Sequence, residues 1–161
     1  NPFEAMGAEN FCSRAYKSGL DGILLVDMPP EESRNFTRAA STNSLDLIRL
    51  IAPTTDEKRI KNICTDASGY IYYISVKGVT GSNKIDPVEV ESKVDTIQSM
   101  TDLPVVVGFG IKDADSVTSV RDLSDGIVVG SALVSLIAEG KNQLSDKISN
   151  KIEELSSALL K

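Results

Sequence analysis

Hydrophobic residues along the chain fall into two patterns, short apolar runs and longer amphipathic stretches between them. The runs are rich in β-branched residues and lack polar alternation, which is typical of strands buried on both faces of a parallel sheet. Strands are therefore predicted, in chain order, within residues 22–26, 45–51, 69–75, 104–111 and 126–133. Apolar residues at helical spacing predict helices over residues 8–17, 31–42, 56–65, 86–100, 113–123, 131–139 and 143–160.

The order of these elements indicates an α/β fold. Strands that alternate with helices through connections of this length form a parallel sheet with right-handed crossovers. The 161 residues suit a single domain, and no linker-like stretch divides them. The first helix is expected to turn four residues towards the core, Phe11, Cys12, Ala15 and Tyr16. The last helix is expected to bury one stripe, Leu144, Ile148, Ile152, Leu155 and Leu159.

Two of the apolar runs contain a glycine at the point where the strand is expected to end and a helix to begin. Gly108 and Gly110 lie in the run PVVVGFGI, and Gly130 precedes Ser131 in GIVVGSAL. Because glycine has no Cβ and a helix N-terminus carries partial positive charge, backbone N–H groups there can approach an anion closely. Each turn alone is better explained by a tight loop, but the pair predicts a phosphate site.

Composition narrows the chemistry further. The formal net charge of -6 and the lack of a basic cluster argue against a nucleic-acid partner, whereas a small phosphorylated metabolite remains compatible. Cys12 and Cys64 form no CxxC pair and the chain has no histidine, so no metal site is expected and both cysteines are expected to be buried. Proton transfer would have to use carboxylate, tyrosine or lysine. No signal peptide or long apolar span is found, which makes a cytoplasmic location the expectation.

Four segments carry a combined signature: LLVDMPPEES at residues 24–33, GYIYYISVKGVTG at 69–81, PVVVGFGI and GIVVGSAL. Together, in this order and spacing, they resemble the α subunit of tryptophan synthase. That family is a (β/α)8 TIM barrel, and the chain resembles its C-terminal part, strands 4 to 8 and the last helix. The expected fold is therefore a partial barrel of five βα units.

The resemblance implies the retro-aldol cleavage of indole-3-glycerol phosphate to indole and glyceraldehyde 3-phosphate. Indole would pass to a partner β subunit that carries pyridoxal phosphate, so the chain would need no cofactor of its own. The phosphate would be held by Gly81, Phe109, Gly110, Gly130 and Ser131, with Thr80 in the adjoining loop. The pocket for the indole would be lined by Leu24, Val26, Tyr72 and Phe109. The loop 76–85 would act as a lid.

The chain departs from the family in one respect that affects catalysis. The family's catalytic Glu and Asp belong to the part that this chain does not match, so no catalytic residue is assigned and the chain alone is expected to be inactive. Asp27 on the rim could orient a loop residue or simply cap a turn. Two alternatives stay open: a Schiff-base aldolase that uses Lys77, and a non-catalytic half-barrel that pairs through open edges at Leu24 and Val128.

Overall fold

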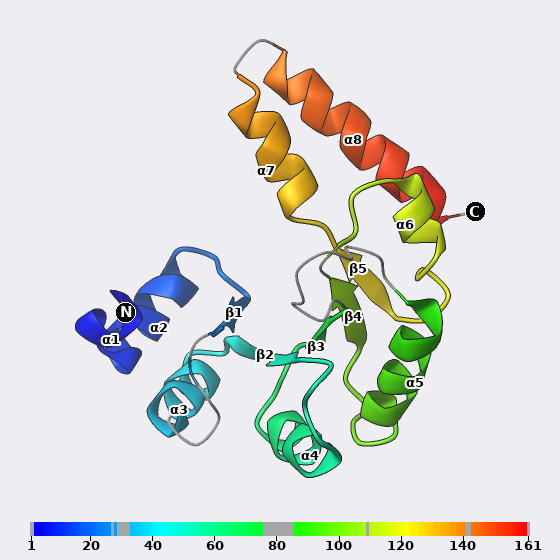
Figure 1. The fold of residues 1–161 in the computed structure, drawn as a ribbon. Helices are drawn as coiled ribbons and strands as arrows, with labels where there is room; N and C mark the ends of the chain where they lie inside the picture. The colour runs from blue at the N-terminus through cyan, green and yellow to red at the C-terminus, as the bar shows by residue number, and fades with distance from the viewer. Residues whose placement is uncertain are drawn as a thin grey trace.

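The structure of the chain is a computed structural model, and it describes residues 2–26, 28, 33–75, 86–108, 110–140 and 143–160. Within these residues, five parallel strands form one sheet in the order of the chain (Figure 1). They are β1 (Gly22–Leu24), β2 (Asp46–Ile51), β3 (Ile71–Ile74), β4 (Val105–Gly108) and β5 (Gly126–Val128). Each strand pairs with the next along the chain, as right-handed crossovers on one side of a sheet require. The expected α/β fold with five parallel strands is confirmed.

Helices occupy the connections between the strands and both ends of the chain. They are α1 (Pro2–Met6), α2 (Ala8–Lys17), α3 (Arg34–Thr42), α4 (Glu57–Thr65), α5 (Pro87–Gln98), α6 (Ala114–Thr118), α7 (Ser131–Ala138) and α8 (Leu144–Leu159). The short helix α1 was not predicted. Helix α6 is shorter than the predicted 113–123, because the chain continues after Thr118 in tight turns that still bury Val120.

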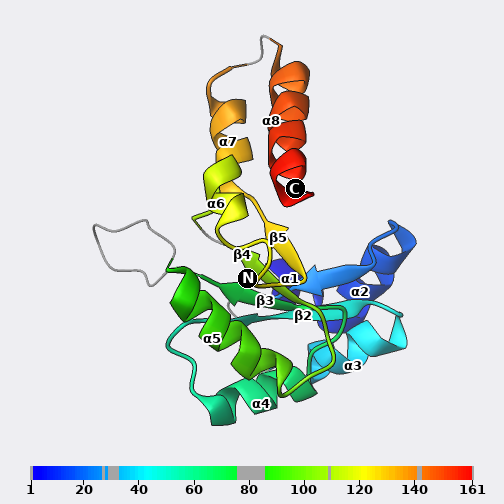
Figure 2. The same ribbon diagram turned by 90° about the vertical axis from the view of Figure 1, so that its right-hand side faces the viewer.

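One face of the sheet is buried beneath helices. Figure 2 shows α3, α4 and α5 together on this side. Strand residues at alternate positions supply the buried layer, because successive side chains of a strand point to opposite faces. They are Ile23, Leu47, Ile51, Ile71, Tyr73, Val105 and Val107. The core divides into a cluster around β1, α2 and α3 and a larger one that reaches from β2 to α8.

The opposite face of the sheet is only partly covered by the residues that the structure describes. Leu24 is 37% exposed and Val26, which follows β1, is 65% exposed. Tyr72, Ile74, Val106 and Val128 on the neighbouring strands are half-buried. Two glycines on this face, Gly108 and Gly126, leave room that Tyr72 and Val106 of the adjacent strands fill. The apolar side chains of this face are thus packed edge to edge but lack a covering layer.

Fewer residues of α2 are buried than the sequence pattern predicts. Cys12 is fully buried and Ala15 is 7% exposed, whereas Tyr16 is 56% exposed, so its predicted inward position is wrong. The helix packs against α1 and α3, and its buried residues are Cys12 and Ala15 alone. Cys64 is buried as well, and burial raises the pKa of both thiols. Both cysteines are therefore buried small residues, as expected.

Helices α7 and α8 lie side by side and project away from the sheet (Figures 1 and 2). Leu155 and Ala158 of α8 are buried in the larger core cluster. Ile152 and Leu159, which the predicted stripe also placed inward, are 48% and 44% exposed, so the stripe is wrong at these two positions. No residue of α7 is fully buried.

Across the described ranges, none of the helices combines the length and the apolar composition that a membrane crossing needs.

Candidate functional site

The two glycine-tipped strand ends lie at the same edge of the sheet. Strands β4 and β5 are parallel neighbours, and Gly108 pairs with Val128. Gly110 and Gly130 each follow two residues after this pair, so both loops leave the sheet on the same side. Gly110 has a φ of +82°, a left-handed conformation that favours glycine. The backbone of the two predicted phosphate loops is therefore brought to adjoining strand ends.

The N-terminus of α7 is open to an anion. Its N-cap is Gly130, which has no side chain to cap the helix, and a Cβ added there would meet nothing within 4 Å. The N–H groups of Leu133 and Val134 bond to the Gly130 carbonyl, at 3.0 and 3.1 Å. The N–H groups of the preceding turn come before the first intrahelical bonds, and Gly130 and Ser131 are exposed. This end can therefore offer backbone donors and the positive end of the helix dipole to a phosphate.

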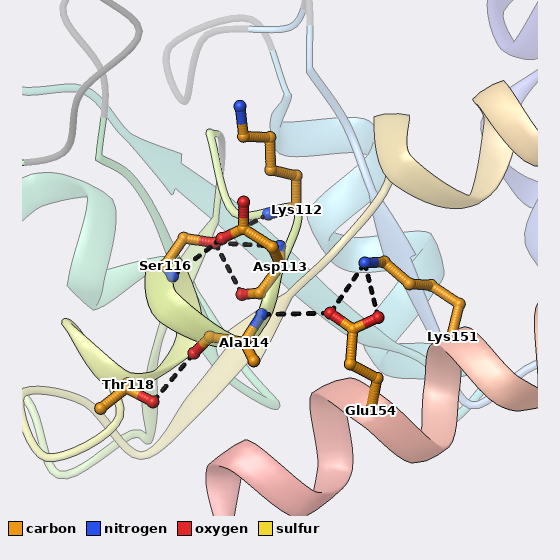
Figure 3. A network of polar contacts seen from close by, with 7 residues as sticks. All are labelled: Lys112, Asp113, Ala114, Ser116, Thr118, Lys151 and Glu154. Carbon is orange, nitrogen blue, oxygen red and sulfur yellow. Dashed lines mark hydrogen bonds and ion pairs between the residues drawn. The ribbon is translucent and has the colours of Figure 1, made fainter.

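The N-terminus of α6, in contrast, is filled by the protein's own carboxylates (Figure 3). The Asp113 Oδ1 atom accepts a hydrogen bond from the Ser116 N–H at 2.9 Å, and the Ser116 hydroxyl accepts from the Asp113 N–H at 3.1 Å. The Ser116 hydroxyl also donates to the Asp113 Oδ1 atom at 2.7 Å, and the two bonds from Ser116 to this carboxylate, the hydroxyl bond first, lower the pKa of Asp113. The Glu154 Oε1 atom, which comes from α8, accepts from the Ala114 N–H at 3.3 Å. The loop after β4 thus offers Gly110 but no free helix end.

Tyr72 lies across β4 directly before the first loop. A Cβ added to Gly108 would collide with the Tyr72 hydroxyl and lie 2.6 Å from its Cζ atom. Desolvation by burial raises the pKa of Tyr72, and the nearby Tyr70 adds to the effect. Its phenol is therefore protonated at neutral pH and is not suited to act as a base. The role of Tyr72 as a wall of the indole pocket stays a prediction.

The predicted indole contacts are not all brought together. Val26 lines a pocket of about 470 Å³ at the ends of β1, β2 and β3, whereas Leu24 and Tyr72 are not among its described lining residues. Leu24 lies on the same face of the sheet as Tyr72, but β1 is separated from β3 by β2. Of the predicted contacts that the structure describes, Leu24 and Tyr72 thus share one face of the sheet but do not lie in one pocket with Val26.

Two arginines in that pocket were missed by sequence reasoning. Arg49 is 2% exposed and donates hydrogen bonds to the hydroxyls of Ser33 and Thr37, while Arg59 on α4 is exposed. A charged residue inside the apolar run LIRLI was the available signal, because a strand buried on both faces rarely carries arginine. Both arginines line the pocket, and the Arg49 guanidinium is held by hydroxyls at the start of α3.

A model of the family described as tryptophan synthase alpha chain matches residues 1–159. The chain belongs to this family. A tryptophan synthase alpha chain of Paraburkholderia phymatum is 45% identical over 160 residues, which cover 99% of this chain and 59% of that one. Another of Thioalkalivibrio sulfidiphilus is 51% identical over 139 residues, which cover 86% of this chain and 52% of that one.

Solved structures of the same family share the fold. The tryptophan synthase α2β2 complex of Pyrococcus furiosus contains a chain that is 34% identical, with a TM-score of 0.85 over 98% of this chain and 64% of that chain. Tryptophan synthase of Mycobacterium tuberculosis gives a TM-score of 0.85 at 28% identity, covering 99% of this chain and 59% of that chain. The five parallel strands therefore form a half-barrel that matches part of the tryptophan synthase alpha barrel. The chain spans less than two thirds of the length of these relatives.

Several predicted residues lie outside the described part of the chain. They are Thr80, Gly81 and Phe109 among the substrate contacts, together with Asp27 and Lys77. Their roles stay predictions. Within the described residues, no group of three or more cysteine, aspartate or glutamate side chains is placed to hold a metal ion.

Proposed function

We propose that the chain supplies the phosphate-binding part of a site that cleaves indole-3-glycerol phosphate to indole and glyceraldehyde 3-phosphate. The observation that carries this proposal is the open N-terminus of α7 beside the end of β4. The N–H groups of Gly110, Gly130 and Ser131 would hold the phosphate. Such backbone donors bind an anion without a cationic side chain, which suits a chain with a net charge of -6.

The reaction itself needs groups that these loops do not provide. Cleavage breaks the bond between indole C3 and the glycerol carbon, and the electron pair stays on C3, which must receive a proton. The hydroxyl on the glycerol carbon loses its proton as the carbonyl forms, and the indole N–H is held during the step. Carboxylates are suited to these proton transfers. The apolar face of Leu24, Val26 and Tyr72 would hold the indole and exclude water.

The catalytic carboxylates would come from the family's remaining length. The 160 matched residues make up 59% of the Paraburkholderia phymatum relative. Roughly 110 of its residues thus lie outside the match, about three βα units at the ~32 residues per strand found here, and three would complete a barrel of eight. The uncovered sheet face with its exposed Leu24 and Val26 fits such a completion. Indole would then pass to a β subunit that carries pyridoxal phosphate.

Complementation tests this proposal directly. The purified chain is mixed with a polypeptide that corresponds to the unmatched part of the Paraburkholderia phymatum relative, and indole formation from indole-3-glycerol phosphate is measured. We expect no turnover from either part alone and measurable turnover from the mixture. A Gly130→Asp variant, which places a carboxylate at the open helix end, should abolish turnover by the mixture. Turnover by the chain alone would show that its own residues carry the chemistry and would refute the proposed division.

A second candidate function is a non-catalytic half-barrel that associates through its open face. The exposure of Leu24 and Val26 beside the edge strand β1 favours it. This reading predicts tight self-association of the chain and no gain of activity on complementation. Light scattering combined with the complementation assay separates the two functions, because only the enzyme reading requires indole to form.

A further inference from the structure

Helix α8 contacts both helices that follow the two glycine-tipped strand ends. Towards α6, the Glu154 Oε1 atom accepts from the Ala114 N–H at 3.3 Å, and the Lys151 ammonium lies 2.9 Å from both oxygens of the same carboxylate (Figure 3). In the turn after α6, the Arg121 guanidinium donates to the Ala158 carbonyl at 2.9 Å. Towards α7, the Lys147 ammonium lies 3.7 Å from the Glu139 carboxylate.

The packing of α6 differs from that of α7. Val117 of α6 and Val120 after it are buried with Leu155 and Ala158 of α8 in the larger core cluster, so α6 and α8 form one packed unit. Helix α7 has no fully buried residue, and Val134 and Ile137 are 62% and 55% exposed. Among the helices and strands that the structure describes, α8 is the main packing partner of α7. The direction of the open α7 N-terminus therefore depends on where α8 lies.

We infer that α8 sets the position of the two phosphate loops relative to each other, with Glu154 as the positioning residue. The loop after β4 enters α6 at Ala114, the group that Glu154 holds. The loop after β5 enters α7, which leans on the same helix α8. Glu154 itself lies in no loop of the site and would not touch the phosphate. This inference rests on the proposed phosphate-binding function of the two loops.

Electrostatics and positioning predict opposite signs for the loss of Glu154. A carboxylate near an anion site repels the anion, so on charge alone its removal should strengthen phosphate binding. If the carboxylate instead holds the start of α6 in place, its removal lets the two loops separate and phosphate binding weakens. The sign of the change therefore distinguishes the two roles without any assumption about its size.

The chain also offers a matched control. Glu153 is the neighbouring residue on α8, is exposed, and makes no hydrogen bond or ion pair with any part of the chain that the structure describes. Glu153→Ala removes the same charge from nearly the same place without touching α6. Glu154→Gln gives a second variant, because it keeps an oxygen that can accept from Ala114 while it loses the charge.

The experiment is a titration of the full 161-residue chain with inorganic phosphate. Binding is measured from the amide NMR chemical shifts of Gly110 and Ser131, at a temperature well below the thermal midpoint of each variant. We expect Glu154→Ala to weaken phosphate binding roughly fivefold, the scale of losing one helix-capping contact. Glu153→Ala should bind as tightly as the parent chain or slightly more tightly. Glu154→Gln should recover most of the lost affinity.

Each other outcome overturns the inference. Unchanged or tighter binding by Glu154→Ala, or equal weakening by the Glu153→Ala control, would show that Glu154 does not position the loops although phosphate binds. If Glu154→Ala does not fold by circular dichroism, Glu154→Gln decides, and a Gln variant that binds phosphate roughly fivefold more weakly than the Glu153→Ala control contradicts the role of the acceptor oxygen. Phosphate that fails to bind the parent chain would remove the proposed cradle itself, and the inference with it.

Discussion

Tyr72 and Gly108 face each other across β3 and β4 at a distance that leaves no room for another carbon atom. The ring of Tyr72 occupies the space in which any side chain at position 108 would lie. Gly108 is not among the residues with a positive φ angle, unlike Gly110. Glycine is therefore required at position 108 by the neighbouring Tyr72 and not by the backbone conformation. The pair fixes the wall of the candidate site immediately before its first phosphate loop.

Gly108→Ala should consequently destabilise the chain by about 1–3 kcal/mol, the usual cost of overpacking a filled site. The added methyl group forces the Tyr72 ring out of its place on β4. Thermal unfolding followed by circular dichroism measures the effect, and Gly130→Ala is the control because a Cβ there meets nothing within 4 Å.

The double variant Gly108→Ala with Tyr72→Ala tests whether the collision is the cause. The methyl group should then cost less than it does beside Tyr72, because the residues that collide have been separated. Additive losses in the two single variants and the double variant would contradict this explanation. So would a Gly108→Ala chain as stable as Gly130→Ala.

At the scale of elements, the sequence pattern located every strand and all helices but α1, because apolar periodicity and turn residues are local properties. Errors arose where burial depends on what lies opposite. Tyr16 and Ile152 have helical spacing appropriate to a core, yet each is about half exposed, because the described part of the chain places nothing over them. Glu154 could not be assigned at all, since its partner Ala114 lies forty residues away in the chain.

Helix α8 allows this distinction between pattern and burial to be measured. Leu155 is 9% exposed and packs in the larger core cluster, whereas Ile152 on the predicted stripe is 48% exposed. Leu155→Ala should lower the free energy of unfolding by about 2–4 kcal/mol, since it leaves a cavity. Ile152→Ala should cost less than about 1 kcal/mol, since little buried surface is lost.

Urea unfolding of both variants gives the comparison. Equal losses for Leu155→Ala and Ile152→Ala would mean that the whole stripe is buried in solution, which would place a covering layer over α8 that the described residues do not contain. Such a result would also require a revised account of how α7 is held, because α7 leans on the same helix.

For the whole molecule, the sequence predicted which segments lie next to each other but not which of their groups are capped or covered by other elements. The two phosphate loops adjoin because parallel strands that are neighbours end at the same edge. That relation follows from element order and could be anticipated. Helix α6 is capped by its own Asp113 and Ser116, whereas the N-cap of α7 is Gly130, so this difference is local to the two segments. Only the additional contact between Glu154 and Ala114 depends on where α8 packs, which no local pattern reports. The residues that were predicted to line the indole are spread over β1 and β3 in the described part of the chain, and their role stays a prediction.

The uncovered face of the sheet leads to the last prediction. Val26 is 65% exposed after β1, and Leu24 within β1 is 37% exposed, so charges there remove part of the buried surface of Leu24 and little of that of Val26. The double variant Leu24→Asp, Val26→Asp should therefore lower the free energy of unfolding by about 1–2 kcal/mol and still fold. The same carboxylates would be forced into an apolar layer if a complementing segment covered this face. That burial is unfavourable for an unpaired charge.

In the complementation assay, the double variant should form indole at least tenfold more slowly than the parent chain at equal concentrations of both parts. A tenfold loss corresponds to about 1.4 kcal/mol in the free energy of association. Val88→Asp is the matched control, because Val88 is 74% exposed on α5, on the helix-covered side of the sheet. It should leave both stability and complementation unchanged. Full complementation by the double variant would mean that the complementing segment does not cover this face, and the half-barrel would have to be completed in another way.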